Sequence, residues 1–300
     1  MFKIRNDKTF DIVNSILLLI LVLVILYPLY FTLIASFSEP YAVVHGEVTF
    51  WFKDFTTESY KQVFNNKELW NGYRNSMVYT VFGTMLSLVL TIPAAYALSK
   101  KNLWNKGIIT TYFVITMYFS GGLLPTYLTV KDIGLLNKPY TLIILGSFSV
   151  FNMVVARTYF QNSIPESLYE AAEIDGASQF KQFFWVGIPL AKPIIAVITL
   201  YYAVGRWNEF YNSLVYITKS KYYSLQLVLR NILLEGQTAL ASIDASSMTA
   251  DEMQYVMRRA YMAEAMKYSI IFIASLPMLI LYPFIQKHFV KGVMVGSVKG

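Results

Sequence analysis

The sequence lacks cysteine altogether and has only two histidines in 300 residues. Without thiols, the chain cannot form a disulfide or a cysteine-ligated metal site. The two imidazoles, on His45 and His288, fall on opposite sides of the membrane in the topology that the hydropathy pattern predicts. A two-histidine metal site within one chain is therefore not expected. The sequence also lacks a cluster of acid, base and nucleophile that would indicate an enzyme.

Two motifs of nucleotide and nucleic-acid chemistry are also missing. No G-x-x-x-x-G-K-[ST] loop occurs, so ATP, if the protein uses it, must be bound by another chain. No run of five or more lysines and arginines occurs, although the formal net charge is +7. The excess of basic over acidic residues therefore reflects membrane topology rather than binding of nucleic acid.

Charged residues are scarce, whereas apolar residues are abundant. Only 14% of the residues are charged, compared with about a quarter in a soluble domain. The chain is 56% hydrophobic and 16% aromatic, and its mean hydropathy is +0.46. These values predict an integral membrane protein, whose spans each need roughly 20 mostly apolar residues.

Six mostly apolar stretches are long enough to cross a bilayer as helices: 12–36, 75–99, 108–130, 139–157, 193–217 and 268–286. Helices are expected because lipid offers no partner to free backbone groups, and the alternating pattern of a membrane β-barrel is absent. The first stretch is too long for a signal peptide and has no small-residue cleavage site, so we expect it to be retained. The predicted fold is an all-α, polytopic membrane protein with six transmembrane helices in one domain, residues 1–300.

The distribution of charge predicts which side each loop occupies. With a cytoplasmic N-terminus, the inner segments carry 12 basic and 6 acidic residues, whereas the outer segments 39–74, 131–138 and 218–267 carry 12 basic and 11 acidic residues. The inner segments are short and have the larger positive balance, as the positive-inside rule requires. Both termini and the loop 163–190 are therefore expected on the cytoplasmic side of the plasma membrane.

The cytoplasmic loop 163–190 is predicted to contain two short helices. Ser163, with Glu166 three residues later, has the pattern of a capping box. Asp175-Gly176 is a turn step at which glycine permits a positive φ, and a second helix would end at Pro189. The first helix is acidic and faces an inner leaflet that is itself negative, so a protein partner explains it better than binding to headgroups.

The spacing inside this loop resembles the EAA loop of ABC importer permeases. The matching positions are Glu170-Ala171-Ala172, Gly176, Val186, Ile188 and Pro189. The usual pattern ends in I-x-L-P, of which Val186 and Ile188 are mild replacements. In that family the loop is a coupling helix that docks into a groove on a cytoplasmic ATPase. The resemblance implies that six residues couple this chain to an ATPase: Glu170, Ala171, Ala172, Asp175, Gly176 and Pro189.

Further segments resemble sugar permeases of the maltose-importer class, in the same order along most of the chain. They are "FTTESYKQVF", "PAAYALSKK", "LPTYLTVKDIGLLNKP", "GRWNEF" and the final "GSVKG". The last segment is similar to the tail of the second permease subunit, which reaches toward the ATPase. This resemblance implies an ATPase-facing role for Gly296, Ser297, Val298, Lys299 and Gly300.

The resemblance also implies the type I ABC importer permease fold and a place in a larger assembly. The partners would be a second homologous permease chain, two ATPase domains and an extracellular solute-binding protein, in a bacterial plasma membrane. ATP and Mg would bind to the ATPase, so no cofactor is expected on this chain, which is not itself an enzyme. Alternating access would move a carbohydrate into the cell, and an oligosaccharide is the expected kind.

Polar residues in the stretch 193–217 are candidates for a substrate pathway. Arg206 and Glu209 lie about three residues apart on one helical face, and charges within a membrane should face protein or water. One interpretation is a pathway that meets sugar hydroxyls and is lined by Arg206, Trp207, Asn208, Glu209, Tyr211 and Asn212. The other is a structural ion pair toward the partner permease, and the sequence leaves both open.

Other functions remain as alternatives. An ABC importer permease for a non-sugar solute is the nearest, because the coupling loop says nothing about the cargo. A self-contained secondary transporter is opposed by the lack of visible internal repeats and by the few intramembrane carboxylates. A membrane enzyme is opposed by the lack of a catalytic cluster.

Overall fold

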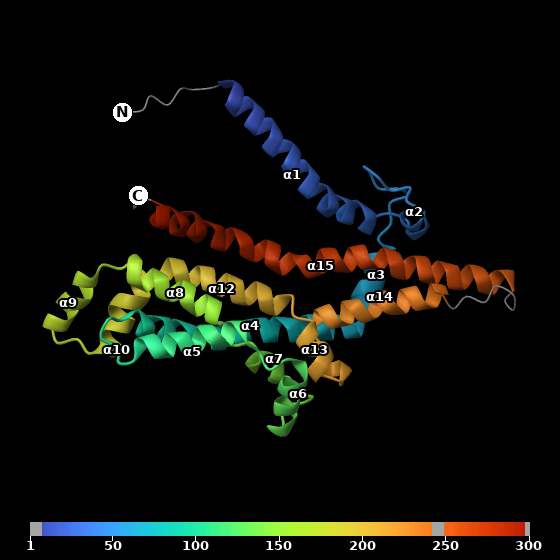
Figure 1. The fold of residues 1–300 in the computed structure, drawn as a ribbon. Helices are drawn as coiled ribbons and strands as arrows, with labels where there is room; N and C mark the ends of the chain where they lie inside the picture. Colours follow the sequence, from blue (N-terminus) through green and yellow to red (C-terminus); the bar gives the residue numbers. More distant parts are fainter. Residues whose placement is uncertain (1–7, 242–248, 298–300) are drawn as a thin grey trace. The chain divides into compact units, whose positions relative to one another are not determined.

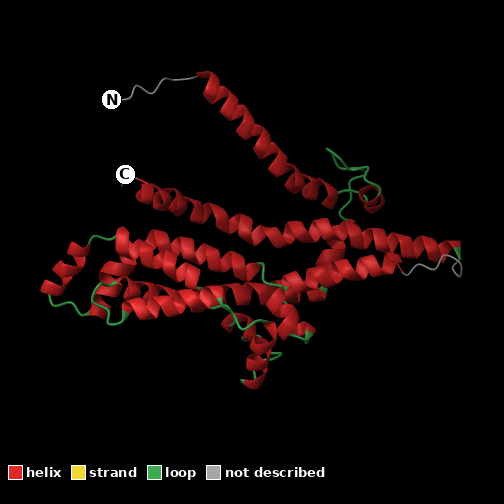
Figure 2. Cartoon of the chain, in the orientation of Figure 1, coloured by secondary structure: helices red, strands yellow, loops and turns green. Residues whose placement is uncertain are grey.

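The computed structural model describes residues 8–241 and 249–297. Every regular element in these ranges is a helix (Figure 2), which confirms the predicted all-α class. The chain divides into two compact units. The first comprises Met1–Lys67 with Leu229–Ser275, and the second comprises Glu68–Val228 with Leu276–Gly300.

The first unit begins with the long apolar helix α1, Lys8–Ser36 (Figure 1). Most of its large apolar side chains are exposed, as in a helix that faces lipid or another chain. Only its last turn is buried, where Ile34 packs with Ala42 and Val43. The other helices of this unit are α2 (Pro40–Val44), α3 (Glu58–Asn65) and parts of α14 (Leu225–Ala241) and α15 (Ala250–Ser297).

The second unit contains the long helix α4 and the shorter elements that follow it (Figure 1). In chain order its elements are α4 (Lys67–Ser99), α5 (Lys106–Tyr118), α6 (Leu123–Asp132), α7 (Thr141–Ile144), α8 (Val150–Asn162), α9 (Glu166–Ile174), α10 (Gln179–Lys181), the π-helix η1 (Gln182–Gly187), α11 (Ile188–Leu190), α12 (Lys192–Trp207), α13 (Tyr211–Tyr216) and the 3-10 helix η2 (Ser220–Tyr222).

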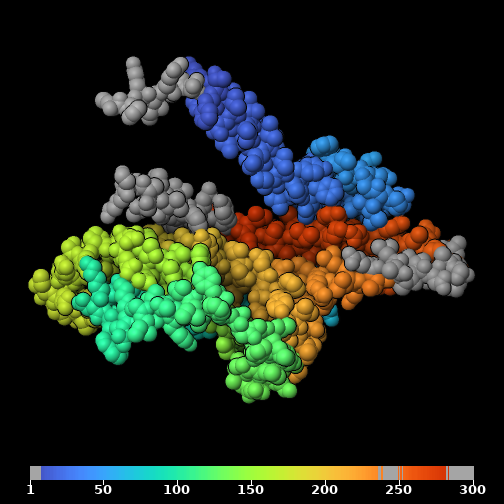
Figure 3. Space-filling view, in the orientation of Figure 1, coloured from blue at the N-terminus to red at the C-terminus, as the bar shows by residue number. Residues whose placement is uncertain are grey.

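The core of the second unit lies among α4, α8 and α12. Tyr96, Met153, Phe160 and Ile198 are buried there. Helix α8 contacts both α5 and α12. Such close packing is what holds helices together in a membrane, where lipid is as apolar as leucine. The core fixes the ends of the loop 163–190, which forms one end of this unit (Figure 3).

In the part of the chain that the structure describes, three single helices are long and apolar enough to cross a membrane: α1, α4 and residues Met253–Leu281 of α15. They contain the predicted stretches 12–36 and 75–99 and most of 268–286. Two bent pairs, α5 with α6 and Gln179–Leu190 with α12, qualify if each pair crosses as one span. The number of crossings therefore stays a prediction.

The predicted stretch 108–130 is not one straight helix. α5 ends at Tyr118, α6 begins at Leu123, and the two are bent by 110°. Gly122 lies between them with φ +82°, a conformation that favours glycine because it has no Cβ. The stretch is therefore helical in two pieces, because hydropathy records apolarity and not the backbone angle that a glycine permits, and whether the two pieces cross as one span stays a prediction.

The stretches 139–157 and 193–217 are also broken. α7 ends before Gly146, whose φ is +68°, and α8 begins only at Val150. The 13 residues of α8 span about 20 Å at 1.5 Å per residue, less than the roughly 30 Å of a hydrocarbon core. α12 ends at Trp207 and α13 restarts at Tyr211, so both stretches are helical only in part.

Candidate functional site

The first helix of the loop 163–190 does not begin with the predicted capping box. α9 starts at Glu166 after Pro165, whose extended backbone (φ −58°, ψ 132°) leads into the helix without a side-chain cap. Ser163 instead directly follows α8, and its N–H donates to the carbonyl of Tyr159 at 2.9 Å. The prediction was wrong because proline at this position already sets the φ that a helix start needs.

The end of α9 lies where the sequence predicted it. Gly176 has φ +73°, its N–H donates to the carbonyl of Glu173, and the N–H of Ala177 donates to the carbonyl of Ala172, each at 2.9 Å. This pair of bonds is a Schellman motif, which satisfies the last carbonyls of a helix and favours glycine. The turn is therefore a defined structure that fixes the direction in which the chain leaves α9.

The second half of the loop contains a π-helix. Ser178 caps α10 by accepting a bond from the N–H of Lys181 at 3.4 Å, and the i→i+5 bonding of η1 then widens the next turn. The buried Gln182 donates from Nε2 to the carbonyl of Ala177 at 3.2 Å. This bond ties the π-helix to the turn after α9, so the two halves of the loop are joined.

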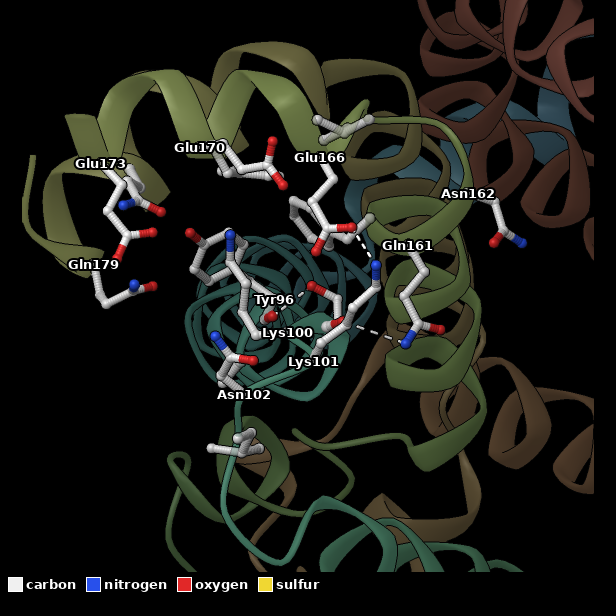
Figure 4. Close-up of a pocket in the computed structure, with 17 residues that line it drawn as sticks. Tyr96, Lys100, Lys101, Asn102, Gln161, Asn162, Glu166, Glu170, Glu173 and Gln179 are labelled. Atoms are coloured by element: carbon white, nitrogen blue, oxygen red, sulfur yellow. Dashed lines mark hydrogen bonds and ion pairs between the residues drawn. The ribbon is translucent and has the colours of Figure 1, made fainter. Parts of the chain in front are cut away.

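One face of α9 turns toward the end of α4 (Figure 4). Glu166, Tyr169, Glu170 and Glu173 recur at helical spacing and line a hollow of about 850 Å³. Lys101, just after α4, forms an ion pair with Glu166. The Glu166 carboxylate is therefore paired with a basic residue of this chain, and Glu170 and Glu173 line the same hollow.

Lys100 occupies the same hollow between two aromatic rings. Its Nζ lies 3.2 Å from the ring centroid of Tyr169 and 4.6 Å from that of Tyr96. Burial lowers the pKa of Lys100 to about 8, while Glu166 and Glu173 act in the opposite direction. Burial also raises the pKa of Tyr169 to about 12, so this phenol is neutral at physiological pH.

The loop also exposes large apolar side chains. Ile174 is 87% exposed, Phe180 79% and Trp185 82%. Exposed groups of this size are unusual when they cluster on one segment, and they mark surfaces that contact another protein or a membrane. Ile174 and Phe180 flank the Gly176 turn in sequence, so this end of the loop presents an apolar surface beside the predicted coupling residues.

The structure brings five of the six predicted coupling residues together at the end of α9. Glu170, Ala171, Asp175 and Gly176 are exposed and Ala172 is half-buried, so a partner can reach them. Pro189 is exposed in the separate helix α11. In the predicted tail, Gly296 and Ser297 end α15, whereas Val298, Lys299 and Gly300 lie outside the described residues.

Arg206 is held by backbone carbonyls. Its Nη1 donates to the carbonyl oxygens of Leu142 and Leu145, at 2.6 Å each, where α7 ends. Gly83 of α4 makes room for the guanidinium, because a Cβ at that position would lie 3.0 Å from Nε. Among residues 8–241 and 249–297, no ion pair joins Arg206 to Glu209. The arginine thus links α4, α7 and α12.

The other candidate pathway residues differ in burial and in hydrogen bonding. The carboxylate of Glu209 accepts bonds from the backbone N–H and from Nδ2 of Asn212, at 3.0 and 2.8 Å, at the start of α13. Trp207 is buried and meets Tyr73 edge to face. Asn208 and Tyr211 are exposed. A role of these residues in a substrate pathway stays a prediction.

Sequence reasoning missed the residues that hold α9 to α4. Lys100 and Lys101 were counted only among the basic residues of the inner segments, and Tyr169 was not singled out. The adjacent pair of lysines directly after a span was the one available signal, because two cations there can meet the acidic loop. Within the described ranges, no group of three or more His, Asp or Glu side chains could hold a metal ion.

A comparison with protein families matches residues 69–295 to the family described as "Binding-protein-dependent transport system inner membrane component". The chain belongs to this family. Its apolar helices and this membership make it a multi-pass membrane protein. The match covers the loop 163–190 and nearly all of α4 and α15, so it includes the candidate site.

Two relatives from Bacillus subtilis (strain 168) are similar over their whole length. "Protein LplC" is 35% identical over 100% of this chain and 98% of its own. The "Polygalacturonan/rhamnogalacturonan transport system permease protein YtcP" is 34% identical over 98% of this chain and 100% of its own. These identities extend the similarity beyond the matched family segment to both ends of the chain.

A solved structure has the same architecture. It is described as a bacterial ABC transporter involved in the import of the acidic polysaccharide alginate, and it matches this chain with a TM-score of 0.82 and 33% identity. The match covers 96% of this chain and 99% of that chain. The fold is therefore that of a type I ABC importer permease, as the resemblance of the EAA loop implied.

Proposed function

We propose that this permease is one half of a paired transmembrane channel in an ATP-driven importer of an oligosaccharide. The second half would be a homologous permease chain. ATP and Mg would bind to two cytoplasmic ATPase domains, with no cofactor on this chain, and an extracellular solute-binding protein would deliver the cargo. Both termini would lie in the cytoplasm. The carbohydrate cargo is supported by the names of two similar proteins, one of a polygalacturonan/rhamnogalacturonan transport system and one of a transporter involved in the import of alginate.

The observation that carries the ATPase coupling is the exposed apolar end of the loop 163–190. Ile174 and Phe180 project beside a Schellman turn whose geometry is fixed by hydrogen bonds. Apolar side chains on a rigid turn suit a groove on another protein, because burying them releases water and orders little additional chain. An ATPase that moves this turn would move α8 and α12, to which the loop is joined.

Coupling of ATP hydrolysis to transport requires a structural element with two conformations, and ATP binding must shift the equilibrium between them. In alternating access, ATP-driven closure of the ATPase pair would shift the loop, and the spans that flank it would open the pathway to the other side. A loop with few internal bonds would absorb that movement. The hydrogen bonds from Gln182 and within the Gly176 turn would instead make the loop 163–190 rigid enough to transmit the movement.

The cargo is tested with the complete transporter in proteoliposomes. The complex of both permeases, the ATPase and the binding protein is assayed for ATP-dependent uptake of an oligogalacturonide, a neutral oligosaccharide and an amino acid. We expect uptake of at least one oligosaccharide and none of the amino acid. Uptake of the amino acid alone would favour the alternative of a non-sugar ABC importer. Uptake driven by an ion gradient without ATP would overturn the coupling proposal.

A further inference from the structure

We propose that Lys100 and Lys101 clamp the coupling helix α9 to the cytoplasmic end of α4, so that movement of α9 is transmitted to α4 as well as to α8 and α12. The inference rests on the proposed function, because it concerns how that loop acts. α8 and α12 are joined to the loop by the chain itself. α4 is remote in sequence, so only side-chain contacts can carry movement to it.

The first contact is aromatic. The Lys100 ammonium lies between the ring of Tyr169, on α9, and the ring of Tyr96, on α4, at 3.2 and 4.6 Å from their centroids. A cation over a ring face is attracted by the ring quadrupole. The two rings themselves meet edge to face, with centroids 5.9 Å apart. One lysine therefore bridges two helices that also touch directly.

The second contact is ionic and lies one residue further along the chain. Lys101 pairs with Glu166 in the first turn of α9, where a carboxylate is also favoured by the helix dipole. Both side chains are well exposed, so the pair contributes little to stability. With Lys100 it gives α9 two points of attachment, near Glu166 and near Tyr169, and two points fix the direction of a helix axis.

The end of α4 is itself anchored, which a clamp requires. The carbonyl of Ser99 accepts bonds from Nζ of Lys106 at 3.2 Å and from Nε2 of Gln161 at 3.3 Å. The carbonyl of Lys100 accepts a further bond from Lys106 at 3.0 Å. α5 and α8 thus hold the backbone from which both lysines project, and the hollow in Figure 4 shows the lysines and the α9 carboxylates facing each other.

Stability does not explain why a lysine occupies position 100. Burial disfavours its charged form, as the lowered pKa shows, and Glu166 and Glu173 offset only part of that cost. An apolar side chain would fill the same gap without desolvating a charge. A contact that contributes little stability and yet joins two helices is better explained by positioning of α9.

The test uses Tyr169, because the chain offers a matched control at that position. Among the described residues the buried Tyr169 hydroxyl has no hydrogen-bond partner, so Tyr169→Phe keeps the ring and loses nothing that the clamp uses. Tyr169→Leu removes the ring face. We expect Tyr169→Leu and Lys100→Met to lower the substrate transported per ATP by roughly 2- to 30-fold, and Tyr169→Phe and Lys100→Arg to keep the wild-type ratio.

These outcomes separate the clamp from the proposed function. If wild-type complexes do not transport, the proposed function fails. If wild type transports and both Tyr169→Leu and Lys100→Met keep its transport per ATP, the clamp is wrong while the function stands. If Tyr169→Leu fails to assemble, as judged by co-purification, Lys100→Met decides the matter alone, because it deletes a charge and leaves an apolar stem of similar length.

A cross-link tests whether the two helices move together. The chain has no cysteine, so Lys101→Cys with Glu166→Cys places its only two thiols on the two sides of the clamp. Transport per ATP is measured in the same sample before and after a short thiol-specific cross-linker is added. We expect it to be retained, because a clamp keeps this separation constant through the cycle. A loss of more than about tenfold would show that α9 and the end of α4 separate, and would overturn the proposal.

Discussion

Gly187 packs directly against the ring of Tyr96: a Cβ atom at Gly187 would lie 3.2 Å from Cε2 of that ring. The ring cannot easily move away, because Phe160, Tyr169 and Phe183 surround it with centroids 4.9 to 5.9 Å distant. The backbone of the π-helix therefore approaches this ring so closely at residue 187 because that residue has no side chain.

Replacing Gly187 with alanine should weaken this contact. Inserting a methyl group into a packed core typically costs about 1–3 kcal/mol, so we expect Gly187→Ala to lower the Tm of the detergent-solubilised complex and to reduce transport per ATP. Gly205→Ala is the control, because a Cβ there meets nothing within 4 Å. Equal Tm values for the two variants would show that η1 can shift away from Tyr96 without cost.

The Gly176 turn should tolerate asparagine but not valine. Its φ of +73° is accessible to asparagine, whereas a β-branched side chain is a strong outlier there. We expect Gly176→Val to insert into the membrane but to lose most substrate-stimulated ATP hydrolysis and uptake. Gly176→Asn should keep most of both activities. Wild-type uptake by Gly176→Val would contradict the role of this turn in coupling.

Arg206 should depend more on the carbonyls of Leu142 and Leu145 than on Glu209. Arg206→Met leaves two carbonyl oxygens without a donor, which costs about 1–3 kcal/mol for each buried group, so assembly with the partner permease should fall. Glu209→Gln keeps an acceptor for the Asn212 backbone N–H and should assemble normally. The double variant should resemble Arg206→Met in a co-purification assay. Rescue by the second substitution would indicate an ion pair between them.

The lowered pKa of Lys100 gives the protein a specific dependence on pH. The folded protein releases this proton near pH 8, whereas the unfolded chain holds it to about pH 10.5. The unfolded state therefore binds more protons between these values, and the free energy of unfolding rises with pH across that window. We expect the Tm of wild type to rise relative to that of Lys100→Met between pH 7.5 and pH 10. A difference that is independent of pH would contradict the pKa assignment.

The exposed Ile174 should matter for docking and not for folding. Its side chain is 87% exposed, and substitutions at such positions usually change stability by less than about 0.5 kcal/mol. We expect Ile174→Ser to keep the Tm of the permease pair but to reduce co-purification of the ATPase. Phe50→Ser, at a side chain that is 73% exposed on the predicted outer side, should leave ATPase binding unchanged. Loss of ATPase binding in both variants would make the effect non-specific.

The sequence by itself determined the class of the protein. Long apolar runs such as 12–36 and 75–99 can only be helices in lipid, because each backbone group must find its partner within the segment. The Gly176 turn was predictable for a similar reason: a helix end beside glycine is a local feature, fixed by φ and by neighbours within five residues. The family followed from the spacing in the loop 163–190, which is also local.

The tertiary structure decided how the site is built. The bends at Gly122 and Gly146 and the contacts of Arg206 with Leu142 and Leu145 depend on which helices pack together, and hydropathy carries no record of that. Lys100 and Tyr169 are 69 positions apart in the sequence, and a cation and a ring attract only when the fold places them within about 6 Å. Their contact is therefore a consequence of packing, which no pattern along the chain could show.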